Sequence, residues 1–148
     1  GLHFTSEVMR SFRKKGIQSA RVTLHVGAGT FKPVKSETIG DHDMHMEFIS
    51  VSRETVQALY ENENNLIVVG TTSMRTVESL YYLGKKILLQ PDIQPEELVV
   101  FQWEPYDEEN PVSPKLALKS IIDYLIRNNA DQLLAFTQVM IVPGYTFH

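Results

Sequence analysis

The order of apolar and polar residues along the chain predicts short strands that alternate with helices. Five segments are expected to be strands: 20–26, 44–51, 66–69, 98–102 and 139–142. In 20–26, Val22 and Leu24 alternate with polar residues, a period of two that is typical of a strand with one buried face. The unbroken apolar run at 66–69 instead favours a strand that is covered on both faces, as in a parallel sheet.

Helix signals fill the stretches between the predicted strands. Four segments carry an apolar stripe at helical spacing: 6–15, 53–62, 73–83 and 114–127. Thr5, Ser52 and Ser113 stand where N-cap residues are expected, and Gly16 and Gly84 are expected to end helices. The pattern therefore predicts an α/β domain, a sheet of short strands with helices packed on it.

Length and composition narrow the class of protein. The 148 residues suffice for one domain with a real core, and the absence of cysteine excludes disulfides, thiolate metal sites and cysteine nucleophiles. The chain has neither an apolar run long enough to cross a bilayer nor a signal-peptide pattern, so we expect a cytoplasmic protein without membrane contact. Because it begins at Gly1 and stops just after Pro143-Gly144, we expect a truncated piece of a larger α/β domain.

Charge is distributed unevenly, although the net charge is only −4. Residues 1–35 hold seven basic residues and one acid, whereas 87–113 hold seven acids and no base. Four of the basic residues are candidate nucleic-acid contacts: Arg10, Arg13, Lys14 and Lys15. On charge alone, the solvated face of a helix explains these four residues better.

Many of the residues that could act in catalysis or ligand binding lie between positions 20 and 48. His25, His42 and His45 stand at or near the ends of two predicted strands, and they are candidates for proton transfer. Their spacing matches no helix-borne zinc motif, so we predict no metal. The loop at 27–33 lacks the third glycine of a dinucleotide-binding motif. We interpret this loop either as a compact connection that brings Thr30 and Phe31 close to a ligand, or as an ordinary tight turn.

The segment Gly70-Thr71-Thr72 is the second candidate site. It joins a predicted buried strand to a helix, and a helix start offers N–H donors and the positive end of the helix dipole to an anion. Arg75 follows one turn later and can add a positive charge. The alternative is that a threonine only caps the helix, while Arg75 pairs with Glu78.

Five blocks of the chain also carry a resemblance to a known family. They are GLHFT (1–5), TLHVGAGTFKPV (23–34), HDMHMEF (42–48), GTTSMRTVE (70–78) and PGYTF (143–147). In this order they resemble the S-adenosylmethionine:tRNA ribosyltransferase-isomerases of queuosine biosynthesis. The resemblance covers residues 1–83 and 139–148, and 84–138 departs from it as a divergent, insertion-like region. The family's β-barrel domain and a further C-terminal segment are not found here, so we interpret the chain as a central fragment.

The resemblance implies an unusual transferase reaction. The ribosyl group of S-adenosylmethionine passes to the aminomethyl group of a 7-deazaguanine at the tRNA wobble position and is rearranged to epoxyqueuosine, with loss of adenine and methionine. It implies that His25, His42 or His45 acts as the base. Thr30, Phe31, Gly70, Thr71, Thr72, Arg75 and Tyr145 would then hold S-adenosylmethionine, which serves as ribosyl donor. Thr71 and Thr72 would bind its carboxylate, and Phe31 or Tyr145 would stack on adenine or on an anticodon base.

Two other functions remain open at this point. One is a metal-dependent hydrolase built on His25, His42 and His45, and the other is a non-catalytic relative that binds a nucleotide or tRNA. The resemblance makes Arg10, Arg13, Lys14 and Lys15 plausible phosphate contacts. We expect the fragment alone to be inactive and able to self-associate, because missing walls would expose apolar surface.

Overall fold

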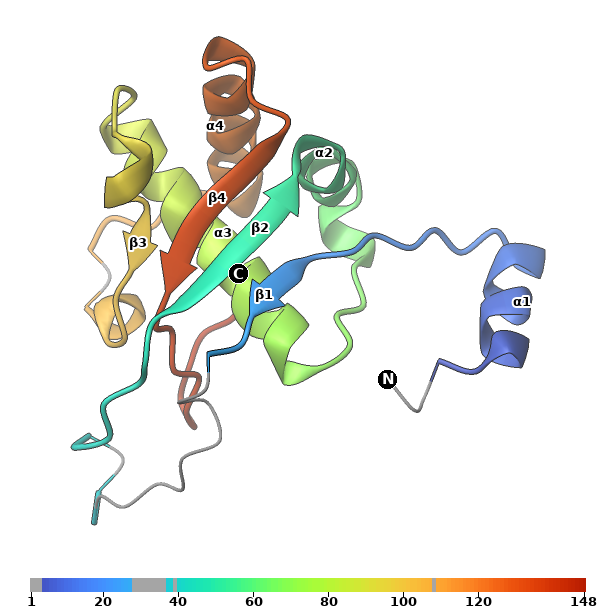
Figure 1. Cartoon of the computed structure of the whole chain (residues 1–148), viewed down its shortest axis with the longest axis horizontal. Helices are drawn as coiled ribbons and strands as arrows, with labels where there is room; N and C mark the ends of the chain where they lie inside the picture. Colours follow the sequence, from blue (N-terminus) through green and yellow to red (C-terminus); the bar gives the residue numbers. More distant parts are fainter. Residues whose placement is uncertain (1–3, 28–36, 39, 108) are drawn as a thin grey trace.

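The computed structural model describes residues 4–27, 37–38, 40–107 and 109–148, with the side chain of Asn64 excepted. Thr30 and Phe31, two of the predicted ligand contacts, lie outside the described residues. The described residues form a mixed four-stranded sheet in the order β1-β2-β4-β3. Its strands are β1 (Thr23–His25), β2 (Glu47–Ser52), β3 (Val99–Val100) and β4 (Gln132–Thr137). β2 runs antiparallel to both β1 and β4, and β3 runs parallel to β4 (Figure 1).

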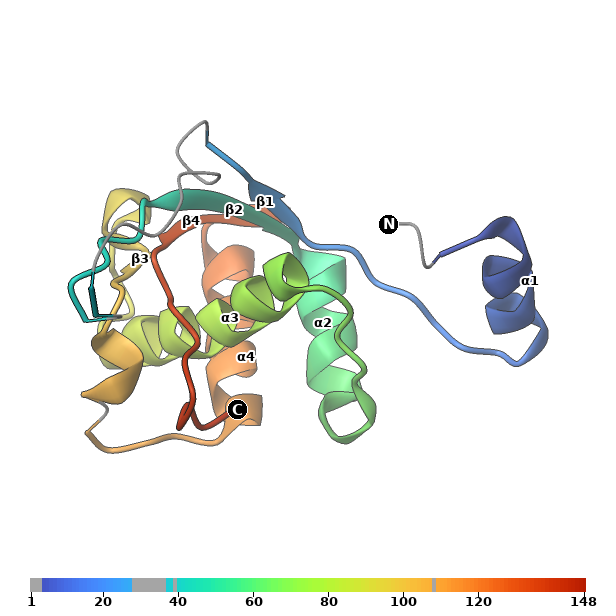
Figure 2. The ribbon, with the colours of Figure 1, turned by 90° about the horizontal axis from the view of Figure 1, so that it is seen from below.

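Three helices pack on one face of this sheet. They are α2 (Arg53–Glu61), α3 (Thr71–Leu89) and α4 (Pro114–Arg127), and Figure 2 shows all three on the same side. We call this side the covered face and the opposite side the open face. Short 3-10 turns η1 (Glu63–Asn65), η2 (Pro95–Glu97) and η3 (Glu104–Tyr106) lie in the connections. The predicted α/β class is confirmed.

Helix α1 (Ser6–Lys14) stands away from the sheet, joined to β1 by residues 15–22 (Figures 1 and 2). Every residue of α1 is described, and none of them is buried. Its N-cap is confirmed, since Thr5 Oγ1 accepts a hydrogen bond from the Val8 N–H at 3.2 Å. Gly16 adopts a φ of 68° directly after the helix, a conformation that a side chain disfavours and that stops the helix as predicted.

The core lies between the covered face and the three packed helices. It is made by alternate residues of β2 and β4 together with the inward stripes of α3 and α4: Ile49, Val51, Leu133, Ala135, Leu80, Leu83, Ile121 and Leu125. Side-chain caps fix where two of the helices begin, because Ser52 Oγ accepts from the Thr55 N–H and Ser113 Oγ from the Leu116 N–H, each at 3.2 Å. Both caps confirm the prediction from the sequence.

Two of the predicted strands are wrong. Residues 66–69 and 139–142 do not join the described sheet, and Ile67 is 87% exposed. The strand β4 takes the central place instead, although it was not predicted. Helices cover this sheet on one face alone in the described residues, so a strand that alternates buried and exposed positions fits better than an unbroken apolar run.

Gly84 does not end a helix as predicted. α3 continues through it to Leu89, and Gly84 marks the point where α3 meets α4. A Cβ at this position would lie 2.2 Å from the carbonyl oxygen of Ala117, so the close approach of the two helices requires glycine. Ser120 Oγ also donates to the Gly84 carbonyl at 2.5 Å.

Residues 84–138 supply α4, β3 and β4, which complete the core and the centre of the sheet. Their expected status as a divergent insertion stays a prediction. Among the described helices, none combines the length and the apolar character that a membrane crossing demands.

Candidate functional site

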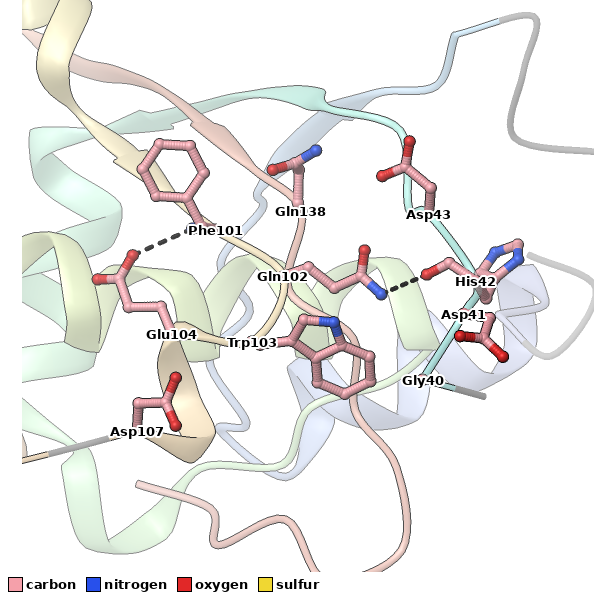
Figure 3. Close-up of a pocket in the computed structure, with 10 residues that line it drawn as sticks. All are labelled: Gly40, Asp41, His42, Asp43, Phe101, Gln102, Trp103, Glu104, Asp107 and Gln138. Carbon is pink, nitrogen blue, oxygen red and sulfur yellow. Dashed lines mark hydrogen bonds between the residues drawn. The ribbon is translucent and has the colours of Figure 1, made fainter. Parts of the chain in front are cut away.

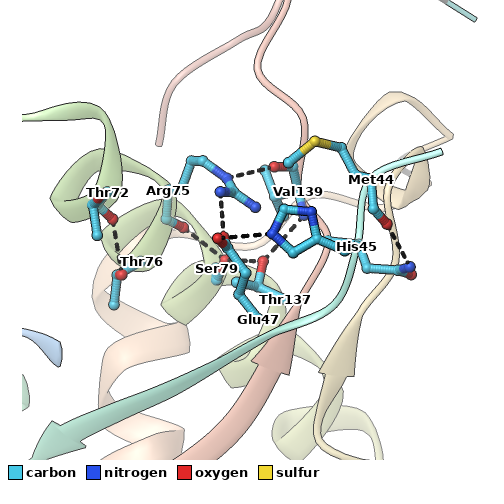
Figure 4. Close-up of polar contacts among 10 residues, drawn as sticks. Met44, His45, Glu47, Thr72, Arg75, Thr76, Ser79, Thr137 and Val139 are labelled. Atoms are coloured by element: carbon cyan, nitrogen blue, oxygen red, sulfur yellow. Dashed lines mark hydrogen bonds and ion pairs between the residues drawn. The ribbon is translucent and has the colours of Figure 1, made fainter. Parts of the chain in front are cut away.

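A buried carboxylate stands at the start of β2. Glu47 points to the covered face, in phase with Ile49 and Val51, and is only 1% exposed. Its carboxylate makes an ion pair with Arg75 Nη1, and its Oε1 lies 3.2 Å from His45 Nε2 (Figure 4). A buried ionised group is stable only with such partners, so Glu47 connects a histidine just before β2 with an arginine of α3.

Arg75 connects three parts of the chain. From α3, its Nη1 reaches Glu47 of β2, and its Nε donates to the Val139 carbonyl after β4 at 2.8 Å. The side chain is 15% exposed, and its Nη2 is buried without a hydrogen-bond partner among the described residues (Figure 4). The alternative pairing with Glu78 is wrong. An unsatisfied buried donor is costly, so Nη2 is a group that a bound acceptor would stabilise.

A cavity of about 260 Å³ is lined in part by Arg75. The residues that line it are mostly apolar and include three methionines: Met44, Thr71, Met74, Arg75, Val139, Met140 and Ile141. Methionine side chains are flexible and polarisable, and they adapt to an apolar or sulfur-bearing ligand. The cavity therefore combines a mostly apolar lining with one cationic residue, Arg75.

The start of α3 differs from the prediction. Its N-cap is Gly70, with a φ of 93°, and no side chain of the described residues caps the helix. Thr71 and Thr72 are exposed residues of the first turn, and the Thr72 carbonyl accepts from Thr76 Oγ1 at 2.9 Å. The expected threonine cap is thus wrong, while Thr71 does line the methionine-rich cavity next to Arg75.

A larger cavity of about 560 Å³ adjoins the segment around His42 (Figure 3). It is lined by Gly40, Asp41, His42, Asp43, Phe101, Gln102, Trp103, Glu104, Asp107 and Gln138. Two glutamine side chains make hydrogen bonds with the backbone of residues 42–44, which contribute to the linings of both cavities. Gln102 donates to the His42 carbonyl at 2.5 Å and accepts from the Met44 N–H at 2.8 Å, and Gln138 donates to the Met44 carbonyl at 2.9 Å.

The three predicted histidines do not converge. His25 lies on the open face, with its ring centroid 5.4 Å from that of Phe48. His42 lines the larger cavity, and His45 contacts Glu47. Within the described part of the chain, no group of three or more His, Asp or Glu residues is placed to hold a metal ion. The described geometry thus gives no ligand set for the metal-dependent hydrolase.

Tyr145 is not among the residues that line the two cavities. Its hydroxyl donates to Glu78 Oε2 at 2.8 Å, and its ring contacts those of Tyr106 and Phe147. Burial, hydrogen bonds with Tyr82 and Glu78, and the charge of Glu78 raise the pKa of the Tyr145 hydroxyl well above its ordinary value. The predicted role of Tyr145 in stacking on adenine stays a prediction.

The candidate nucleic-acid contacts keep their exposure in the structure. Arg10, Arg13 and Lys14 are exposed on α1, and Lys15 is the exposed C-cap residue. Arg13 and Lys14 stand in the last turn, where positive charge is favourable for the helix dipole. Their contact with phosphate stays a prediction.

The whole chain is similar to one protein family. The family of queuosine biosynthesis proteins matches residues 1–148. The chain belongs to this family. The resemblance inferred from the five sequence blocks is confirmed.

Two similar proteins have names that state an enzymatic activity. Two S-adenosylmethionine:tRNA ribosyltransferase-isomerases, from two strains of Clostridium kluyveri, are each 54% identical over 83 residues. The match covers 54% of this chain and 24% of each relative, so the chain spans about a quarter of the length of these family members. No solved structure matches the chain.

Sequence reasoning missed Glu47 as the centre of the site. One signal was available, because Glu47 is in phase with Ile49 and Val51 on the buried side of the strand. Gln102 and Gln138 gave no comparable signal, since each acts through the distant segment 42–44.

Proposed function

We propose that this chain carries part of the donor site of an S-adenosylmethionine:tRNA ribosyltransferase-isomerase. The observation that carries the proposal is the match of the whole chain to the queuosine biosynthesis family, with relatives of that name at 54% identity. The reaction would transfer the ribosyl group to a 7-aminomethyl-7-deazaguanine in tRNA and rearrange it to epoxyqueuosine. The partner would be the tRNA anticodon loop, and the cytoplasm is where such an enzyme meets its substrate.

The methionine-rich cavity supports a place for the methionyl end of the donor. The carboxylate would accept from Arg75 Nη2, which has no partner among the described residues, and from N–H groups of the uncapped first turn of α3. The thioether carbons would lie against Met44, Met74 and Met140. This assignment keeps Gly70, Thr71, Thr72 and Arg75 in the donor site.

Among the three histidines, His45 is the best placed base. It lies beside the Arg75–Glu47 pair, whereas His25 is on the open face. When the Glu47 carboxylate accepts the Nε2–H, the lone pair of the imidazole stands on Nδ1, the tautomer that a base requires.

Calorimetric titration of the chain with S-adenosylmethionine tests the donor site. Arg75→Lys keeps a cation beside Glu47 but removes the Nη2 donor, and loss of a charge-assisted hydrogen bond is worth about 1.5–3 kcal/mol. We expect the dissociation constant to rise about tenfold or more. Arg53→Lys is the matched control, because Arg53 begins α2 and pairs with the exposed Asp131. An unchanged constant in Arg75→Lys would move the carboxylate to another site.

Adenine release tests the reaction itself. The chain is mixed with S-adenosylmethionine and tRNA that contains the precursor base, and adenine is quantified by chromatography. We expect donor binding with little turnover, because walls of the site contributed by the rest of the family's length orient the two substrates. A chain that neither binds the donor nor releases adenine would contradict the proposed function.

A further inference from the structure

The larger cavity has no part in the proposed donor site, although it adjoins that site. Asp43 and Gln138 line the larger cavity, whereas the residues that follow them in the chain, Met44 and Val139, line the methionine-rich cavity. Gln102 also lines the larger cavity, and its Oε1 accepts from the Met44 N–H at 2.8 Å. The two cavities are therefore neighbours with a common wall, as a transfer between two bound molecules requires.

A tryptophan ring forms part of the lining of the larger cavity (Figure 3). Trp103 is half-buried, and its ring contacts that of Tyr106, with the two centroids 5.6 Å apart. The Tyr106 hydroxyl donates to the carbonyl of Met140, a residue of the methionine-rich cavity, at 2.8 Å. The indole is thus positioned through a residue that is bonded to the donor site, and its face can stack on a heterocyclic base.

The lining of the larger cavity is acidic. Four residues contribute carboxylates, and none of the described lining residues is lysine or arginine: Asp41, Asp43, Glu104 and Asp107. Glu104 already pairs with Lys86 Nζ at 2.9 Å, whereas the side chains of Asp43 and Asp107 make no hydrogen bond within the described part of the chain. Such a lining repels phosphate and attracts a cation with N–H donors.

We propose that the larger cavity binds the acceptor base, 7-aminomethyl-7-deazaguanine. The ring system stacks on Trp103, and the aminomethyl group, which is protonated at neutral pH like other aliphatic amines, faces the carboxylates of Asp43 and Asp107. The volume of about 560 Å³ is within the range of about 300–1,000 Å³ that is usual for small-ligand sites. The proposal rests on the proposed function, which supplies the identity of the base, and it concerns binding alone.

Titration of the chain with the free base tests this assignment. Trp103 is the only tryptophan of the chain, so quenching of its fluorescence reports on this cavity, and calorimetry checks the dissociation constants. The matched ligand is 7-cyano-7-deazaguanine, which keeps the ring system and lacks the cation. We expect the aminomethyl base to bind about fivefold or more tightly than the cyano base, with a smaller difference at high salt. Equal constants, or no saturable binding of the aminomethyl base, would overturn the proposal.

Two carboxylates are tested by substitution. Asp43→Asn with Asp107→Asn keeps the shape of the cavity, and we expect the preference for the aminomethyl base to fall below about twofold while binding of the cyano base stays unchanged. Asp123→Asn with Asp131→Asn is the matched control, because it removes the same charge from residues that line neither cavity. Circular dichroism checks that both double variants fold. Wild-type preference in the Asp43 and Asp107 variant would contradict the assignment.

The stacking contact is tested separately. Trp103→Leu keeps an apolar side chain but removes the ring, and we expect calorimetry to show about fivefold or more weaker binding of both bases. Trp103→Phe keeps a ring and should keep most of the affinity. Wild-type affinity in Trp103→Leu would show that the base does not stack on this residue.

Titration with S-adenosylmethionine separates failure of this proposal from failure of the proposed function. Donor and base should bind together, because they occupy neighbouring cavities, so saturating donor should leave binding of the base unchanged or tighter. Displacement of the base by the donor would mean that one cavity holds both, and the assignment would be wrong. A chain that binds the donor but not the base refutes only the acceptor site, whereas a chain that binds neither also contradicts the proposed function.

Discussion

Replacing Gly84 by alanine should destabilise this protein, although the same change stabilises most helices. Glycine inside a helix costs about 1 kcal/mol relative to alanine. Here the new Cβ would lie 2.2, 2.6 and 2.9 Å from the carbonyl oxygen, carbonyl carbon and Cα of Ala117. All three atoms belong to the backbone of α4, so no change of rotamer can relieve the overlap.

The size of the effect follows from the contact between the helices. Normal separation of nonbonded heavy atoms is about 3.5–4.0 Å, so α3 and α4 would have to move apart by about 1 Å. Overpacking of this kind costs about 1–3 kcal/mol. The movement also strains the hydrogen bond from Ser120 Oγ to the Gly84 carbonyl, worth about 1 kcal/mol. After the gain in helix propensity, we expect a net loss of about 1–3 kcal/mol in the free energy of unfolding.

Urea denaturation followed by circular dichroism measures this loss. Gly40→Ala is the matched control, because its Cβ would meet Thr38 Oγ1 at an ordinary 3.7 Å, and its effect should stay within about 0.5 kcal/mol. Adding Ala117→Gly should not rescue Gly84→Ala, since the overlapping atoms remain in place. A Gly84→Ala chain as stable as the wild type would refute the reasoning.

Two further predictions concern buried polar groups. Glu47→Ala leaves Arg75 buried without its counter-ion, and we expect the free energy of unfolding, measured by urea denaturation, to fall by about 3–5 kcal/mol. The double variant Glu47→Leu with Arg75→Met should recover most of that loss. A double variant no more stable than Glu47→Ala would contradict this. Because the pKa of Tyr145 is raised in the folded chain, the unfolded chain loses that proton first, and stability should fall as the pH rises above about 10. Tyr145→Phe should flatten this fall in unfolding measured against pH, and an unchanged slope would show that other groups cause it.

The sequence allowed helix starts to be predicted better than strands. The caps at Thr5, Ser52 and Ser113 depend on one side chain and an N–H three residues away, so local sequence contains the whole interaction. The strand β4 was missed for a physical reason. Its exposed positions include Leu134 and Phe136, so apolar residues on the open face hide the alternation with Leu133 and Ala135.

The candidate site was predictable only in part. The sequence pointed to His45 and Arg75 separately, because each stood near the end of a predicted element. Their connection through Glu47 spans 28 residues and depends on how α3 lies against β2, which no local pattern encodes. The unpartnered Nη2 of Arg75 likewise becomes visible only once the packing around it is known.

The position of β4 next to β2 means that the sheet can form fully only late in synthesis of the chain. Its partners in β2 are far away along the chain, from 80 residues (Ser52 to Gln132) to 90 residues (Glu47 to Thr137). At about 5–20 residues per second, β2 leaves the ribosome several seconds before β4. During that time its Ile49 and Val51 lack the strand that pairs with it, and a nascent β2 is an edge open to other chains. Protection of this edge by a chaperone, or by slow, dilute expression, should therefore improve the yield of folded protein.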